Sequence, residues 1–180
     1  MKCKAMLVAA VALGSVAGCA TNIQPQDQTI VPPKVPFSRF AAVAILPLET
    51  DRSDADQGDR RAIQRISDAF TGCMRTVFPN LRTARPDESF PPSTLLVAPR
   101  IEDMTKKTSA ERIFLGPLAG SSAVLFKTTY TNAADRSILA APVFYTKANS
   151  WSGAFTLGST DNLIMSRVVN NACNYARSHR

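Results

Sequence analysis

The sequence predicts an α+β domain in which two helices pack on one face of a mostly antiparallel sheet of about four to five strands. Two stretches carry apolar side chains at helical spacing, and the short apolar runs between them end at prolines, glycines or polar loops. The expected order is strand, helix, short strand, strand, hairpin and helix, which is typical of an α+β sandwich. A chain of 180 residues has room for one such domain, which we place at residues 37–180.

The first predicted strand and the first predicted helix lie between residues 40 and 77. Residues 40–48 form a continuous apolar run, as in a strand that is buried on both faces. Residues 49–59 follow as a loop rich in aspartate and arginine. An amphipathic helix of about five turns comes next and ends before Pro79. Its apolar positions are Ile63, Ile66, Phe70, either Cys73 or Met74, and Val77.

The middle of the domain is predicted to consist of strands. Residues 80–93 contain three prolines and predict a short strand followed by a loop. Residues 94–101 predict a further strand, in which Pro99 indicates a sheet edge or a bulge. Residues 122–131 and 137–147 are two more apolar runs separated by five polar or small residues. They predict a β-hairpin.

The last predicted element is a helix near the end of the chain. Residues 159–161, with the sequence Ser-Thr-Asp, offer an N-cap for it. One face of this helix is apolar, as expected if it packs on the sheet beside the first helix. That face carries Ile164, Val168, Ala172, Cys173 and Ala176.

Residues 1–18 have the features of a secretory signal peptide: a basic start, an apolar run over 5–16, and small residues at its end. This run has 12 residues, whereas a helix needs about 20 to cross a bilayer. The plain alternative is a secreted protein that is cut near Gly18. However, residues 16–19 resemble the lipobox of bacterial lipoproteins, in which the cysteine is lipidated on sulfur, and this resemblance implies lipidation of Cys19. It also implies sorting to the outer membrane, facing the periplasm, because Ala20 rather than aspartate follows the cysteine.

Residues 19–36 are expected to form a tether between the lipid and the domain. The segment holds four prolines and has no amphipathic period, so it cannot form a helix. An extended chain that rises ~3.1 Å per residue would hold the domain a few tens of Å from the lipid surface.

The four cysteines have different expected fates. Cys3 leaves with the leader and Cys19 carries the lipid, which leaves Cys73 and Cys173, each on the apolar face of a predicted helix. The periplasm is oxidising, so two neighbouring thiols there become a disulfide. The alternative is two independent buried thiols, since free cysteine packs well as a small hydrophobic residue. The pattern favours a Cys73–Cys173 disulfide.

No pattern in the sequence predicts a catalytic, cofactor or metal site. The single histidine, His179, is next to the C-terminus, where chains fray. The acidic residues of 51–59 lack the ligand order of a calcium loop, and no zinc-ligand spacing occurs. Residues 116–122 superficially resemble a phosphate-binding loop, but no lysine follows the second glycine. The net charge of +7 includes no block of five basic residues, which argues against nucleic-acid binding.

Four stretches of the domain, residues 40–48, 111–120, 139–145 and 158–162, resemble an uncharacterised family of small proteobacterial lipoproteins with a domain of unknown function. The layout is more distantly similar to the accessory lipoproteins of curli secretion and of peptidoglycan-synthase activation. This resemblance implies an α/β sandwich on a lipid tether that works through protein contacts. It implies a loop between strands around Arg112, Gly116 and Gly120, and it carries over no catalytic residues.

The expected function is therefore that of a non-catalytic lipoprotein of the cell envelope that binds another envelope protein. The interaction loop is expected at Arg112, Gly116 and Gly120. One alternative is a periplasmic hydrolase or small-ligand-binding lipoprotein that uses residues 112–122. Another is a subunit of a secretion or pore assembly.

Overall fold

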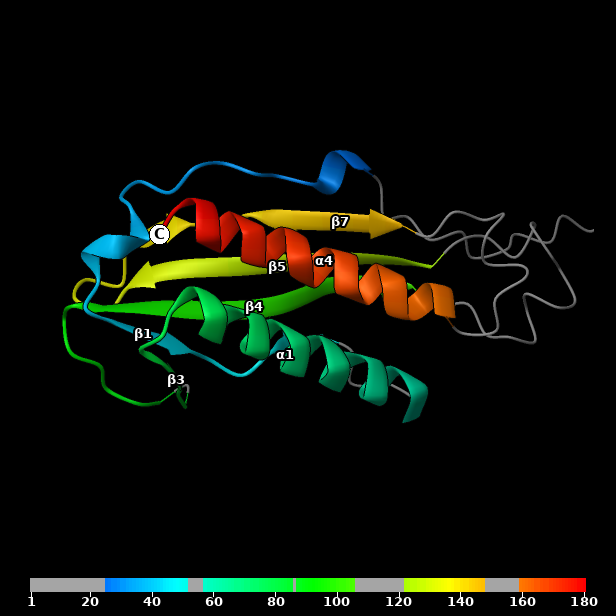
Figure 1. The fold of residues 1–180 in the computed structure, drawn as a ribbon, viewed down its shortest axis with the longest axis horizontal. Helices are drawn as coiled ribbons and strands as arrows, with labels where there is room; N and C mark the ends of the chain where they lie inside the picture. The colour runs from blue at the N-terminus through cyan, green and yellow to red at the C-terminus, as the bar shows by residue number, and fades with distance from the viewer. Residues whose placement is uncertain (1–24, 52–56, 86, 106–121, 148–158) are drawn as a thin grey trace, which may run out of the picture.

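The structure is a computed structural model that describes residues 25–51, 57–85, 87–105, 122–147 and 159–180. Within those ranges it contains seven strands in one sheet, two α-helices and two short 3-10 helices (Figure 1). The 3-10 helices are η1 (Pro25–Asp27) and η2 (Phe37–Arg39), and the α-helices are α1 (Gln57–Val77) and α4 (Ser159–Ser178). The strands are β1 (Ala42–Ile45), β2 (Glu49–Thr50), β3 (Leu81–Thr83), β4 (Thr94–Thr105), β5 (Ala123–Asn132), β6 (Ile138–Ala140) and β7 (Val143–Lys147).

The sheet is mixed. Its strand order is β3-β1-β4-β5-β6, while β2 also pairs with β4 and β7 also pairs with β5. The pairs β1·β3, β1·β4 and β2·β4 are parallel, and β5 is antiparallel to β4, β6 and β7. The predicted α+β class is correct, but the prediction of a mostly antiparallel sheet of four to five strands is wrong.

Two physical causes explain this difference. The chain passes through α1 between β1 and β3, and such a crossover through a helix makes the two strands parallel. Prolines also raise the number of strands, because a proline has no N–H for the ladder. Pro142 divides the predicted strand 137–147 into β6 and β7, and Pro47 lies between β1 and β2. β2 lies in the stretch 49–59 that was predicted as a loop, so that prediction is wrong at its start.

Pro99 lies in the middle of the sheet and not at its edge. It is opposite Thr128 of β5, whose own N–H donates in the other direction, to the carbonyl of Pro142. The two residues therefore form a non-hydrogen-bonded pair, and the nitrogen of Pro99 faces the β1 and β2 side. β1 pairs with residues 94–97 and β2 with residues 100–101, so Pro99 lies opposite the gap between those strands, where no ladder bond is lost.

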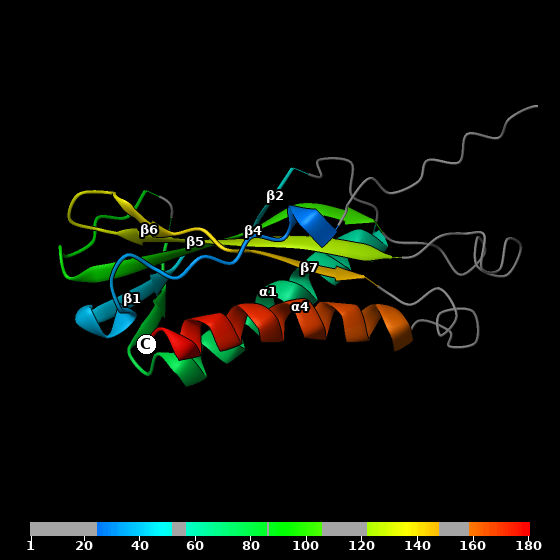
Figure 2. The same cartoon turned by 90° about the horizontal axis from the view of Figure 1, so that it is seen from above.

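Both helices cover the same face of the sheet, as predicted (Figure 2). Ile66, Phe70 and Met74 of α1 are buried in the main core, and Phe70 meets Phe126 of β5 edge to face at 5.2 Å. α1 begins at Gln57, earlier than the sequence predicts, so Asp59 lies in its first turn. A carboxylate is favoured there by the helix dipole.

The structure joins Cys73 of α1 to Cys173 of α4 in a disulfide, which confirms the predicted pair. The two Cα atoms are 6.3 Å apart, within the ordinary range for such bonds. Cys173 is buried and Cys73 is half-buried. The bond links the two elements of the helical layer across a sequence separation of 100 residues.

The edge segment, residues 28–37, lies along β7 and β6 (Figure 1). Thr29 and Val143 exchange two backbone hydrogen bonds, of 3.0 and 2.7 Å, and the N–H of Lys34 donates to Leu139 at 3.0 Å. The hydroxyl of Tyr175 donates to the carbonyl of Val31 at 2.7 Å. From Thr29 onward, the predicted tether is therefore part of the folded domain, because its residues other than proline still offer donors and acceptors.

The C-terminal end of α4 is packed, contrary to the expectation that His179 frays. The His179 ring lies 4.6 Å from the ring of Tyr175, and its carbonyl accepts the N–H of Phe37 at 2.8 Å. Phe37 is buried, and its ring stacks on that of Tyr130 at 4.4 Å. The two ends of the domain are thus fixed to each other.

No helix in the part of the chain that the structure describes is long and apolar enough to cross a membrane.

Candidate functional site

The candidate site lies on the open face, which is the face of the sheet opposite α1 and α4. Side chains alternate along a strand, so Ile101 and Phe126 point into the helix-covered core while their neighbours Arg100 and Lys127 occupy the open face. One end of this face is covered by a small apolar cluster. Its buried members are Ala44, Ala84 and Leu96, with Leu46, Phe90 and Ala133 packed against them.

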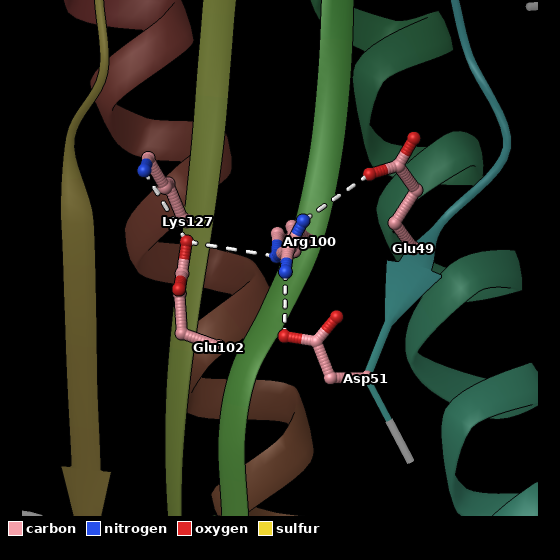
Figure 3. Close-up of polar contacts among 5 residues, drawn as sticks. All are labelled: Glu49, Asp51, Arg100, Glu102 and Lys127. Carbon is pink, nitrogen blue, oxygen red and sulfur yellow. Dashed lines mark hydrogen bonds and ion pairs between the residues drawn. The ribbon is translucent and has the colours of Figure 1, made fainter. Parts of the chain in front are cut away.

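Beyond that apolar cluster, the open face carries a charged cluster of five side chains: Glu49, Asp51, Arg100, Glu102 and Lys127 (Figure 3). The Arg100 guanidinium is at its centre. One Nη lies 2.5 Å from Asp51, the other lies 3.5 Å from Glu49, and Nε lies 3.8 Å from Glu102. The same oxygen of Glu102 lies 3.2 Å from Lys127 Nζ. Three strands therefore contribute to one network of ion pairs.

Strand register brings these residues together. Parallel pairing of β2 with β4 places Glu49 opposite Arg100, and antiparallel pairing of β4 with β5 places Lys127 opposite Arg100 on the other side. The β4·β5 register shifts between Ile101 and Asp103, which leaves Glu102 without an opposite residue. This irregularity lets the Glu102 carboxylate reach both cations.

The chemistry of the charged cluster suits recognition of charge. Three carboxylates face two cations, and the side chains of Arg100, Glu102 and Lys127 are 31–36% exposed. The hydrogen bond to Asp51, followed by its charge, raises the pKa of the Arg100 guanidinium further above its usual range, so this group stays protonated. The cluster contains no hydroxyl, thiol or imidazole that a base could activate. Ion pairs of this exposure can exchange their partners for charges on a second protein.

We expect the charged cluster to add little to stability. Arg100→Gln should lower the urea midpoint slightly at low ionic strength and leave it nearly unchanged in 1 M NaCl, because solvent and salt screen exposed ion pairs. Urea unfolding followed by circular dichroism at both salt concentrations measures this. A large loss that persists in high salt would instead assign Arg100 a structural role.

Several residues that the sequence analysis singled out lie outside the described residues. These are Cys19 and the predicted interaction loop at Arg112, Gly116 and Gly120. Of the acidic stretch 51–59, Asp51 pairs with Arg100 and Asp59 belongs to α1. The described part of the chain contains no group of three or more His, Cys, Asp or Glu side chains placed to hold a metal ion.

The charged cluster was not predicted, although the sequence carries a signal for it. β4 and β5 are almost wholly apolar on the helix side, yet Arg100 and Lys127 interrupt them at positions that face the other way. Long charged side chains in otherwise buried strands indicate that one face of the sheet is not covered. The alternation could be seen in the sequence, but the pairing of Arg100 with Glu49 and Asp51 could not.

No protein-family model matches the sequence, and no curated protein compared with it matches either. Solved structures with a similar fold include protein XCC0632 from Xanthomonas campestris, a DUF330 protein, with a TM-score of 0.51 and 7% identity over 84% of this chain and 94% of that one. A PelC dodecamer from Paraburkholderia phytofirmans gives a TM-score of 0.46 and 12% identity over 84% of this chain and 95% of the PelC chain. Lipoprotein GNA1162 from Neisseria meningitidis gives 0.30 and 10%, over 74% and 97% of the two chains. The likeness to XCC0632 is one of fold.

Proposed function

We propose that this chain is a lipid-anchored protein of the cell envelope that binds another envelope protein through the open face and has no catalytic activity. The observation that carries this proposal is the charged cluster around Arg100, a network of ion pairs on a sheet face that neither helix covers. Charged side chains at an interface steer association and select the partner by complementary charge. A partner with its own charged patch would fit this face.

A binding role accounts for the open face better than catalysis does. Each carboxylate of the charged cluster already lies within 4 Å of Arg100 or Lys127, so the cluster holds no acid or base without an ion-pair partner, whereas a general acid–base mechanism needs a group that is free to exchange a proton. The two cysteines in the described ranges are joined in the disulfide and offer no thiol nucleophile.

The envelope location is supported by the leader and by the disulfide. The lipobox-like residues 16–19 follow a short apolar run, and disulfides persist in oxidising compartments such as the bacterial periplasm. We place the protein at the outer membrane, on its periplasmic face, held by acyl chains on Cys19. By the resemblance to accessory lipoproteins of curli secretion and peptidoglycan-synthase activation, the partner belongs to an envelope assembly or an envelope enzyme.

The anchor is tested by the change Cys19→Ala in the native cell. The unchanged protein should be found in the membrane fraction with a mass that fits a chain starting at an acylated Cys19, whereas the variant should be neither acylated nor membrane-bound. Mass spectrometry of the protein extracted from membranes makes this measurement. An unmodified thiol on Cys19 of the unchanged protein would contradict the anchor.

The binding surface is tested by crosslinking in intact cells. A photoreactive amino acid at Thr129, on the open face, should capture one defined envelope protein, whereas the same group at the exposed Ala69 of α1 should not. Reversing two charges in Arg100→Glu with Lys127→Glu should lower the yield at Thr129 by about tenfold or more, because like charges at an interface cost several kcal/mol. Arg61→Glu with Arg167→Glu, two exposed changes on the helical layer, is the control with the same change in charge. Equal yields from both variants, or a product that contains only this chain, would contradict the proposal.

A further inference from the structure

Exposed apolar side chains gather at one edge of the sheet. Four large hydrophobic residues of the described ranges are exposed, and three of them lie at this edge: Ile30 (53%), Val31 (59%) and Ile138 (52%). The first two belong to the edge segment, and Ile138 belongs to β6, beside which the edge segment lies through the hydrogen bond from Lys34 to Leu139. Figure 1 shows this segment along the outer side of β7.

The length of chain before this edge limits its distance from a lipid anchor. Pro25, the first residue of η1, follows Cys19 by six residues. Even a fully extended chain spans at most ~3.6 Å per residue, so Pro25 lies within about 22 Å of the Cys19 Cα atom. Because Thr29 is already paired with Val143, an anchor at Cys19 keeps the edge near the bilayer.

The edge is poorly suited to pairing with a further strand. Pro32 and Pro33 have no N–H, and the N–H groups of Thr29 and Lys34 already donate to Val143 and Leu139. An edge with so few free donors does not extend a sheet. Its neighbourhood is cationic, because four exposed cations outnumber two exposed acids there: Lys34, Arg39, Arg136 and Lys147 against Asp27 and Asp135. Exposed apolar side chains among lysine and arginine suit a surface with anionic headgroups.

We propose that this edge rests on the membrane surface, with Ile30, Val31 and Ile138 at the boundary between headgroups and acyl chains. The inference rests on the proposed lipidation of Cys19 and extends it: the lipid not only holds the domain but sets its orientation. With this edge on the bilayer, the sheet and the helical layer are both roughly perpendicular to the plane of the membrane. The charged cluster is then accessible from the side to a partner in the same membrane.

A tryptophan placed at the edge tests this arrangement. Trp151 is the single tryptophan of the chain, so the change Trp151→Phe gives a silent background. In that background, Ile30→Trp reports on the edge and Ala69→Trp reports on the outer side of α1. The full lipidated protein is placed in vesicles of phosphatidylethanolamine, phosphatidylglycerol and phosphatidylcholine brominated on its acyl chains. Because bromine quenches on contact, we expect roughly a twofold loss of emission for the tryptophan at 30 and none for that at 69.

Each other outcome has a definite meaning. Equal quenching at both positions would show a domain without fixed orientation and would overturn the proposal. A blue-shifted but unquenched tryptophan at 30 would show that a second copy or another protein covers the edge, and would also overturn it. If Ile30→Trp disturbs folding, Val31→Trp makes the same measurement. If mass spectrometry before reconstitution finds no acylated protein, both the proposed lipid anchor and the proposed orientation are overturned. If the protein is acylated but the tryptophan at the edge is not quenched, only the proposed orientation is overturned.

Discussion

Replacing both Cys73 and Cys173 by alanine is expected to lower the free energy of unfolding by about 4–5 kcal/mol. In the chain-entropy model, a bond that closes a long loop restricts the unfolded chain, and the loop here spans 100 residues between two helices. Urea unfolding of the variant and of the unchanged protein, followed by circular dichroism, measures the difference. Alanine is the suitable replacement because Cys173 is buried, where a serine hydroxyl would add its own cost.

Two controls separate the bond from the side chains. Reducing the unchanged protein should cause most of the same loss, and a reductant should have no effect on the double variant. The single variant Cys73→Ala should lose nearly as much as the double variant, because breaking the bond is the dominant cost. Two free thiols in the denatured, unreduced protein, or stability that does not respond to the reductant, would contradict the prediction.

The helical layer could be predicted from the sequence because its signals are local. The spacing of Ile66, Phe70 and Met74 marks the face of α1 that is buried, and it places Cys73 next to that face. The same reasoning places Cys173 on the apolar face of α4. The disulfide is then expected because the periplasm is oxidising. The start of α1 could not be predicted in the same way, because the charged residues around Asp59 suit a solvated loop as well as a first helical turn.

The sheet could not be predicted to the same degree, because strand pairing depends on contacts between distant residues. Nothing local shows that β4 lies between β1 and β5, and Pro99 argued for an edge. That residue is tolerated in the centre because Pro47 interrupts the neighbouring strand at the matching place. Pro99 thus loses no ladder hydrogen bond because Pro47, about fifty residues earlier, interrupts the neighbouring strand. Neither proline alone predicts this arrangement.

The charged cluster depends on the same long-range pairing. Glu49 and Asp51 belong to the stretch 49–59, which was predicted to be a loop. Nothing local in that stretch shows that the two carboxylates pair with Arg100. The edge segment also depended on tertiary contacts. Its prolines predicted an extended chain, and the chain is extended, but Phe37 and the hydrogen bonds of Thr29 and Lys34 attach it to the domain.

The second large effect is expected from Phe37→Ala, which should lower the free energy of unfolding by about 3–5 kcal/mol, as truncating a buried phenylalanine does. The Phe37 ring is buried between Tyr130 at 4.4 Å, Tyr175 at 6.3 Å and Phe78 at 6.4 Å. Alanine would leave a cavity among these rings. Urea unfolding measures the loss, and the exposed Val31→Ala should change stability by less than about 0.5 kcal/mol.

The same substitution connects stability to membrane orientation. Phe37 is the core residue that ends the edge segment, so its truncation should loosen residues 28–36 from β6 and β7 even where the rest of the domain stays folded. Phe37→Ala is added to the two acylated tryptophan proteins, each in the Trp151→Phe background. The tryptophan at position 30 should stay quenched. The tryptophan at position 69 should become more quenched than before, because a loosened edge segment no longer fixes the orientation of the domain. Phe37→Leu keeps most of the side-chain volume, should cost less than ~1.5 kcal/mol, and should preserve the difference between the two positions. If Phe37→Ala cost no more than Val31→Ala, the ring would not hold the segment, and the orientation would have to come from the lipid alone.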